Sequence, residues 1–303
     1  MSHLVRSSIL VLVCSAFACE PEPTDNPGSG GTPAASGGRT ATGGTGPVAS
    51  GGKASGGTAT GGRASGGTAT GGKATGGNPS GGSSSSCTPW PAATGTQALT
   101  ATRSISGTVD LGLVRYTGWG GSDAEGQDPL FNLSNGATLK NVIIGAPAGD
   151  GIHCAGQCTL INVWFEDVGE DAVTFRGSSS SQVSTIDCAG AKSASDKILQ
   201  HNGAGTVMVK NFWAQTFGKV YRSCGNCSTQ YARHVVLSNI TATGGSTIAG
   251  INTNYGDSAK FWNVSAGGAS LCDRYTGNNT GAEPVRTGSG IDGTYCIQLT
   301  AAP

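Results

Sequence analysis

The strongest constraint on the fold is a short motif that recurs between residues 139 and 264. Each copy has an apolar residue, a variable residue, Asn and a second apolar residue, and successive polar markers are 21, 25, 24, 28 and 24 residues apart. A strand-rich chain with a repeat of about 20–30 residues is typical of a solenoid. We expect a parallel β-helix in which every marker occupies the same bend and side-chain amides hydrogen-bond from coil to coil. The markers are Asn141, Asn162, Asp187 (in place of Asn), Asn211, Asn239 and Asn263.

Residues 87–303 are predicted to form the folded part of the chain. Short runs of Val, Ile, Leu and Phe alternate there with Gly, Ser, Asn and Asp, which indicates many short strands. The chain contains 52 glycines, and glycine suits sharp bends that need positive φ. The fold class is therefore all-β, in a single domain. A Greek-key sandwich is the alternative, although its strands would not repeat a marked bend.

The first 86 residues are expected to lie outside this domain. Residues 1–18 have the features of an export signal, with Ala16-Phe17-Ala18 as the cleavage site. Cys19 follows directly, as in bacterial lipoproteins, so we expect lipid attachment at Cys19; simple secretion with an incidental thiol is the alternative. In residues 19–86 a Gly-Gly pair recurs every five residues between 51 and 82, which predicts a disordered tether. The protein would be extracellular, or an outer-membrane lipoprotein exposed at the cell surface.

Eight cysteines lie in the predicted domain, an even number that indicates disulfides in an exported protein. Their pairing does not follow from the sequence. A zinc site with four thiolate ligands is the alternative, and oxidising conditions after export disfavour it. Its ligands would be Cys154, Cys158, Cys224 and Cys227.

Charged residues are few and clustered. The 18 basic and 18 acidic residues of the whole chain balance, which argues against a general nucleic-acid binder. Between residues 87 and 303, with 13 basic and 15 acidic residues, the clusters follow one another at about one coil each. Three carboxylates suit Ca²⁺, so an acidic metal site is expected to pass into a basic strip along the helix axis. The alternative is a solvated face of unrelated ion pairs. The clusters are Asp150, Glu170-Asp171, Asp196-Lys197, and Lys219 with Arg222.

The stretch from Glu125 to Asp257 resembles polysaccharide lyase family three, the small single-domain pectate lyases. The resemblance covers most of the predicted domain, and residues 270–303 match less clearly. The matching segments are Glu125–Gln127, Gly136–Gly145, Asp150–Cys154, Asn162–Trp164, Glu170–Ala172, Ala194–Lys197, Gln200–Gly203, Arg222–Cys227 and Gly250–Asp257.

The resemblance implies a right-handed parallel β-helix that cleaves polygalacturonate by calcium-dependent β-elimination. It implies that three carboxylates hold Ca²⁺ and that Lys197 is the base. Arg222 is expected to steady the substrate carboxylate and the negative charge that develops on it. The implied calcium ligands are Asp150, Glu170 and Asp171.

Three further residues are expected to lie at the site. Lys219 would bind a neighbouring carboxylate of the polymer, and Asp196 would lie beside the reacting sugar. Glu125 matches a family acid near the site, where it would contact either the substrate or the metal. A free lysine has a pKa of about 10.4, and nearby cations would lower the pKa of Lys197 while Asp196 would raise it. We therefore expect an alkaline preference, and a monomer with no nucleic-acid partner.

Two other functions fit the same fold. A polygalacturonase would use Glu170 and Asp171 as acid and base for hydrolysis, but this leaves Lys197 and Arg222 without a task. A non-catalytic cell-surface module that binds polysaccharide is the second alternative, because repeats on a tether also suit adhesins. The dispersed residues His153, His201 and His234 are expected to be structural, and Trp119 and Tyr255 are candidates for stacking on sugars.

Overall fold

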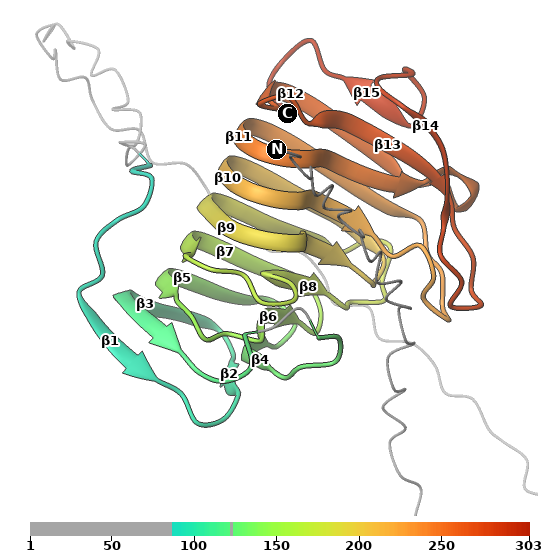
Figure 1. Ribbon diagram of the computed structural model, residues 1–303. Coiled ribbons are helices and arrows are strands. Elements are labelled where there is room, and N and C mark those ends of the chain that lie inside the picture. Colours follow the sequence, from blue (N-terminus) through green and yellow to red (C-terminus); the bar gives the residue numbers. More distant parts are fainter. Residues whose placement is uncertain (1–86, 122–123) are drawn as a thin grey trace, which may run out of the picture. The chain divides into compact units, whose positions relative to one another are not determined.

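The computed structural model describes residues 87–121 and 124–303, which form a parallel β-helix (Figure 1). Fifteen strands make one continuous hydrogen-bonded sheet that is coiled on itself. The expected β-helix is confirmed, and the sandwich alternative is wrong. The predicted export signal, Cys19 and the predicted tether lie outside the described residues.

Two rows of strands build the coils. One row runs β1-β3-β5-β7-β9-β10-β11-β12-β15, and a second row, β2-β4-β6-β8, joins it at β9. Among the described strands, only β13 and β14 pair antiparallel. In chain order the strands are β1 (Gly95–Ala98), β2 (Arg103–Ile105), β3 (Thr108–Thr117), β4 (Pro129–Leu133), β5 (Ala137–Ile144), β6 (Asp150–Cys154), β7 (Cys158–Phe165), β8 (Val173–Phe175), β9 (Val183–His201), β10 (Gly205–Ser223), β11 (Arg233–Asn252), β12 (Ser258–Ser265), β13 (Ser270–Thr276), β14 (Val285–Ser289) and β15 (Cys296–Gln298), with one 3₁₀ helix, η1 (Thr253–Tyr255).

Left-handed backbone conformations turn the chain at the corners of the coils. The Asn markers adopt positive φ, for example 58° at Asn162 and 50° at Asn211. Asn tolerates this conformation better than most non-glycine residues. Each Asn marker also donates its amide N–H to the previous coil: Asn162 to Asn141 at 2.8 Å and Asn239 to Asn211 at 3.0 Å. The repeat therefore marks both a bend and a hydrogen-bonded ladder, as the sequence predicts.

The assignment of Asp187 as a marker is wrong by one residue. The strand register pairs Asp187 with Ile161, so the position of Asn162 on this coil belongs to Cys188. Cys188 has φ 55° and forms a disulfide with Cys87. Asp187 nevertheless continues the ladder, because its carboxylate accepts the Asn211 amide at 2.8 Å. On this coil a disulfide-bonded cysteine therefore occupies the corner position that Asn has on the other coils.

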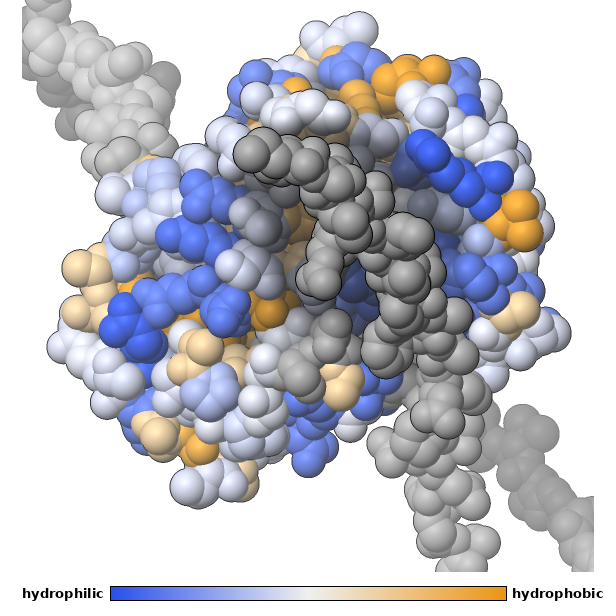
Figure 2. Space-filling view, in the orientation of Figure 1, coloured by the Kyte–Doolittle hydropathy of each residue, from blue (hydrophilic) through white to orange (hydrophobic). Residues whose placement is uncertain are grey.

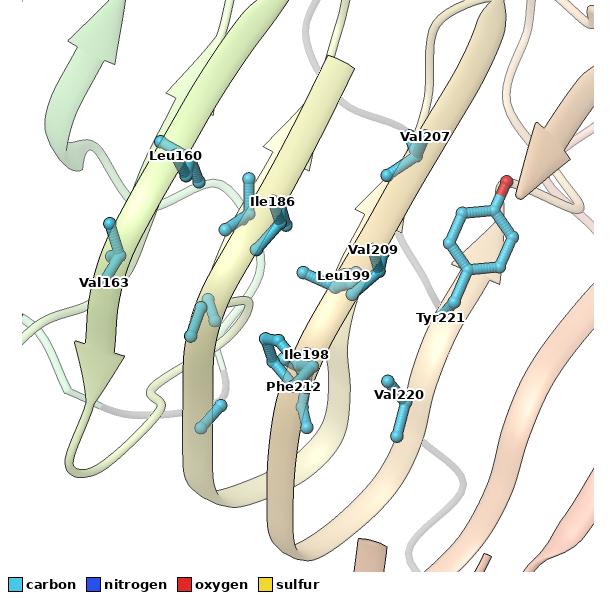
Figure 3. Close-up of a cluster of buried hydrophobic side chains, with 14 of the residues drawn as sticks. Leu160, Val163, Ile186, Ile198, Leu199, Val207, Val209, Phe212, Val220 and Tyr221 are labelled. Carbon is cyan, nitrogen blue, oxygen red and sulfur yellow. The ribbon is translucent and has the colours of Figure 1, made fainter. Parts of the chain in front are cut away.

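The apolar residues on either side of each marker point into the coil. Strand register places Leu160, Ile186 and Val209 directly above one another, and Figure 3 shows these side chains within one interior cluster. Each is at most 1% exposed. Burial of such stacked rows supplies the main stabilisation of the fold, at roughly 25 cal/mol per Å² of apolar surface removed from water.

Four disulfides link the eight cysteines of the described region: Cys87–Cys188, Cys154–Cys158, Cys224–Cys227 and Cys272–Cys296. The zinc alternative is wrong, because the four candidate thiolates are paired within their own segments. Such bonds are typical of proteins that fold outside the reducing cytoplasm.

The visible surface of the domain is mainly hydrophilic or of intermediate hydropathy, with apolar residues in small separate patches (Figure 2). The described part of the chain has one helix, η1, with three residues. No helix in the described residues is long and apolar enough to cross a membrane.

Candidate active site

Asp150, Glu170 and Asp171, here called the acidic cluster, meet where two successive coils turn. Asp150 begins β6, and the other two residues precede β8. Backbone hydrogen bonds hold the coils together at this point, from Gly151 N–H to the Asp171 carbonyl at 3.0 Å and from Glu170 N–H to the Gly149 carbonyl at 2.8 Å. All three carboxylates are buried, at 3–5% exposure.

Burial and mutual repulsion dominate the electrostatics of the acidic cluster. Burial, the hydrogen bond with Glu125 and the charges of Asp150 and Asp171 raise the pKa of Glu170 to about 10. Burial also raises the pKa of Asp171 well above its ordinary value, although Lys197 opposes this. One oxygen on each residue lacks a hydrogen-bond partner: Asp150 Oδ1, Glu170 Oε2 and Asp171 Oδ1. Buried oxygens of this kind are costly unless a cation or proton satisfies them.

The donor set of the acidic cluster fits a hard cation such as Ca²⁺, because all its donors are oxygen atoms. Within the described residues, however, no three acidic, His or Cys side chains already surround a point as metal ligands. Each carboxylate is instead engaged elsewhere. Asp150 contacts His153, Glu170 bonds with Glu125, and Asp171 lies 3.8 Å from the Lys197 ammonium.

Lys197 and Lys219 lie beside the acidic cluster as neighbours on β9 and β10, where strand register pairs them. Asp196 bridges the two ammonium groups, at 2.7 Å from Lys197 and 2.9 Å from Lys219. Glu125, from the turn before β4, approaches Lys197 to 3.8 Å. The structure thus brings the two lysines together with Asp196 and Glu125.

The charges of the lysine pair influence one another. Burial raises the pKa of Asp196, but the two ammonium groups outweigh it and lower the pKa to about 2. Burial lowers the pKa of Lys197, whereas Asp171, Asp196 and Glu125 together raise it above its ordinary value. The acidic neighbours therefore hold Lys197 in its charged form when the carboxylates are ionised.

Arg222 lies three residues beyond Lys219 on β10 and is 7% exposed. Its Nη1 donates to Asn252 Oδ1 at 3.1 Å, and its guanidinium carbon lies 4.1 Å from the ring centroid of Tyr275. Burial lowers the pKa of Arg222, but an arginine remains charged in proteins. Arg222, Asn252 and Tyr275 are called the arginine cradle below.

Sequence reasoning missed three residues of this region. His153, expected to be structural, contacts the Asp150 carboxylate through Nε2 and Arg176 through Nδ1. Its position three residues after Asp150, on the same strand, is the signal that could have found it. Asn252 and Tyr275 of the arginine cradle were also missed, because they lie 30 and 53 residues beyond Arg222 in the chain.

The other expected residues lie elsewhere. His201 is buried between the Tyr221 hydroxyl and the Ala204 carbonyl, and His234 bonds with Ser258, so both are structural as expected. Tyr255 packs beside Gly277, and the Trp119 carbonyl accepts the Gly149 N–H next to the acidic cluster.

Comparison with known proteins gives a consistent family assignment. The family model described as pectate lyase matches residues 87–281, more than half of the chain. A probable pectate lyase F of Aspergillus terreus is 49% identical over 184 residues, covering 59% of this chain and 79% of that protein. Pectate lyase E of Emericella nidulans is 43% identical over 214 residues, covering 69% of this chain and 83% of that protein.

Solved structures agree with these sequence relatives. The catalytic domain of pectate lyase PelI from Erwinia chrysanthemi is 34% identical, with a TM-score of 0.55 over 68% of this chain and 97% of that domain. PelI in complex with tetragalacturonic acid matches with 37% identity and a TM-score of 0.53, over 66% of this chain and 67% of that one. With its fold, its buried charge clusters and these relatives in agreement, the chain belongs to the pectate lyase family.

Proposed function

We propose that this pectate lyase cleaves polygalacturonate by calcium-dependent β-elimination, with Lys197 as the base. The observation that carries the proposal is the position of Lys197. Its buried ammonium group lies 3.8 Å from Asp171 of the acidic cluster and 2.7 Å from Asp196. The proposed base and the proposed calcium site are thus neighbours.

The elimination uses groups that the chain supplies. Neutral Lys197 takes the proton from C5 of a galacturonate unit, the electrons of that bond form the C4–C5 double bond, and the bond from C4 to the linking oxygen breaks. The departing oxygen then takes a proton from solvent or a nearby acid. Positioned proton transfer of this kind contributes about 10²–10⁴-fold to rate.

Asp150, Glu170 and Asp171 would hold the calcium ion, using the oxygens that have no hydrogen-bond partner. A bound calcium ion would offset the charge of the substrate carboxylate and so acidify the neighbouring C5 proton. The contacts of Asp150 with His153 and of Asp171 with Lys197 must loosen for the carboxylates to converge. Loss of the Asp171 contact would also lower the pKa of Lys197, which favours its role as base.

Arg222 and Lys219 complete the proposed site. Arg222 offers donors to the substrate carboxylate and stabilises the charge that develops on it, as preorganised donors do in other active sites. Lys219 binds a neighbouring carboxylate of the polymer, for which it must exchange its contact with Asp196. Glu125 and Asp196 border the reacting sugar. Because Lys197 acts in its neutral form, turnover should rise with alkaline pH.

An absorbance assay on polygalacturonate tests the proposal. Unsaturated products that absorb in the ultraviolet should accumulate with calcium and should stop accumulating when a chelator is added. Saturated products with new reducing ends would indicate a hydrolase of the polygalacturonase type instead. Binding of polygalacturonate without turnover would indicate a non-catalytic module.

Export and attachment form a separate part of the proposal. The four disulfides support an extracellular location. We propose cleavage after Ala18 and lipid attachment at Cys19, with the protein working as a monomer. Metabolic labelling with a fatty acid, compared between the native chain and Cys19→Ser, tests the attachment; equal labelling would contradict it.

A further inference from the structure

The arginine cradle contains a hydrogen-bond network that the reaction described above does not use. Asn252 and Asp257 both lie in the segment Gly250–Asp257, and both are 0% exposed. Ser223, next to Arg222 on β10, is also fully buried. Fully buried polar side chains require complete sets of partners, so the contacts of this network define the role of each member.

The Asn252 amide can point in only one direction. Its Nδ2 is surrounded by acceptors, namely the carbonyls of Ser223 at 3.3 Å and Cys224 at 3.0 Å, the Ser223 hydroxyl at 3.0 Å and Asp257 Oδ2 at 3.3 Å. A flipped amide would direct its oxygen at these acceptors and its NH₂ group at the Arg222 guanidinium. Because both contacts would be repulsive, Asn252 Oδ1 must face Arg222 Nη1.

Asp257 fixes the rest of the network. Its Oδ2 accepts the Ser223 hydroxyl and the Asn252 backbone N–H, the latter at 2.8 Å, and its Oδ1 accepts the Arg233 backbone N–H at 2.9 Å. The Ser223 hydroxyl donates to Asp257, and its lone pair therefore faces the Asn252 amide. The chain returns from Asn252 to Asp257 through η1 and Gly256, whose φ of 79° suits glycine.

Glycines leave room for the guanidinium. A Cβ at Gly225 would lie 2.5 Å from Arg222 Nη2, and one at Gly250 would lie 3.0 Å from Arg222 Cδ. The Tyr275 ring, on β13 two strands away from β10, covers the guanidinium at 4.1 Å. A long and flexible side chain is thereby confined from several sides before any substrate binds.

We propose that Asn252 is a positioning residue that aims Arg222 at the substrate, and that Asp257 sets the direction of the Asn252 amide. This inference rests on the proposed role of Arg222 and gives the Gly250–Asp257 segment a function. A flexible arginine would lower the reaction rate, because misplacing a catalytic group by about 1 Å can reduce the rate by about 10²-fold.

A double-mutant cycle between Arg222→Lys and Asn252→Ala tests the proposal, with kcat and KM for polygalacturonate measured at saturating calcium. Loss of a hydrogen bond to a charged group predicts a fall in kcat/KM of about 10- to 100-fold for Asn252→Ala, mainly in kcat. Once lysine replaces Arg222, the same Asn252→Ala change should cost less than about 3-fold. Asn254→Ala is the matched control. Asn254 lies in the same segment as Asn252, but it bonds with Gly277 and not with Arg222.

The outcomes distinguish a failure of the positioning role of Asn252 from a failure of the proposed function of Arg222. The positioning role would be overturned if the losses of kcat/KM in Arg222→Lys and Asn252→Ala simply multiplied in the double variant. It would also be overturned if Asn254→Ala showed the same coupling with Arg222→Lys as Asn252→Ala does. Unchanged kcat/KM in Arg222→Lys alone would overturn the proposed function of Arg222 instead. If Asn252→Ala fails to fold, Arg222→Ala is assayed with added guanidinium chloride. Rescue that exceeds the effect of ammonium chloride at equal ionic strength is expected, and an equal effect of both salts would overturn the proposal.

Discussion

The acidic cluster and the arginine cradle are both buried and charged, but their polar groups are paired to different extents. In the arginine cradle, the Asn252 amide oxygen accepts from Arg222 Nη1, and the amide nitrogen donates to the carbonyls of Ser223 and Cys224. In the acidic cluster, by contrast, three carboxylate oxygens have no hydrogen-bond partner, and burial raises the pKa of Glu170 and of Asp171. The fold therefore fixes the direction of Arg222, whereas the proposed calcium ion would complete the acidic cluster.

The largest expected effect lies at the boundary between these regions. Lys197→Ala should lower kcat by about 10²–10⁴-fold because it removes the proposed base. Steady-state assays at several alkaline pH values are the measurement. Lys192→Ala is the matched control, since Lys192 lies on the same strand with its ammonium over the Trp90 ring. Turnover that persists in Lys197→Ala would assign the base elsewhere.

The second prediction breaks the acidic half. Asp171→Asn should lower kcat/KM by about 10²-fold at a fixed calcium concentration, because a charged ligand is lost. It should also weaken the rise in melting temperature that calcium gives the native chain. Asp167→Asn, at an exposed carboxylate four residues away, should change neither quantity. Calcium-induced stabilisation that is the same in Asp171→Asn and the native chain would argue against a cation at this cluster.

The third prediction concerns pH without calcium. The pKa of Glu170 is raised from 4.5 to about 10, so the folded protein holds this proton more tightly than the unfolded chain does. Its contribution to stability is complete below pH 4.5 and is lost progressively as pH rises toward 10.

Glu170→Gln stays neutral over this range, so its melting temperature in chelator should fall less steeply with pH than that of the native chain. Thermal melts across the range give the comparison. Parallel curves for the two proteins would show that Glu170 does not carry the raised pKa.

The smallest effect is expected from a glycine substitution beside the arginine cradle. Gly225→Ala adds a methyl group 2.3 Å from Pro284 Cγ and 2.5 Å from Arg222 Nη2, so the proline ring and the guanidinium must both shift. A loss of about tenfold in kcat/KM is expected, with calcium-induced stabilisation unchanged. Simultaneous loss of calcium binding would mean that the two halves of the site are coupled.

Much of the fold could be predicted from the sequence because its information is local and periodic. The Asn repeat specifies one bend per coil and places its apolar neighbours inside. The same repeat misled at Asp187, where a disulfide at Cys188 took the corner position. Periodicity cannot detect this replacement, because it depends on Cys87, which lies 101 residues earlier.

The candidate site divides in the same way. Scarce charges at intervals of one coil predicted that Asp150, Glu170-Asp171 and Lys197 would approach one another, and the structure brings them together. Their protonation could not be predicted, because it depends on burial. The partners of Arg222 could not be predicted either. Asn252 and Tyr275 lie on later coils, and the sequence does not give the strand register that places them beside Arg222.

The sequence by itself determined the coil, its bends and the order of charges along the axis, because each of these repeats with a fixed spacing. Only the tertiary structure decided which charged side chains find hydrogen-bond partners within the protein. That outcome depends on side-chain direction and on exclusion of water, which neighbouring coils impose together. The same packing that gives Arg222 a fixed partner leaves oxygens of the acidic cluster unpaired.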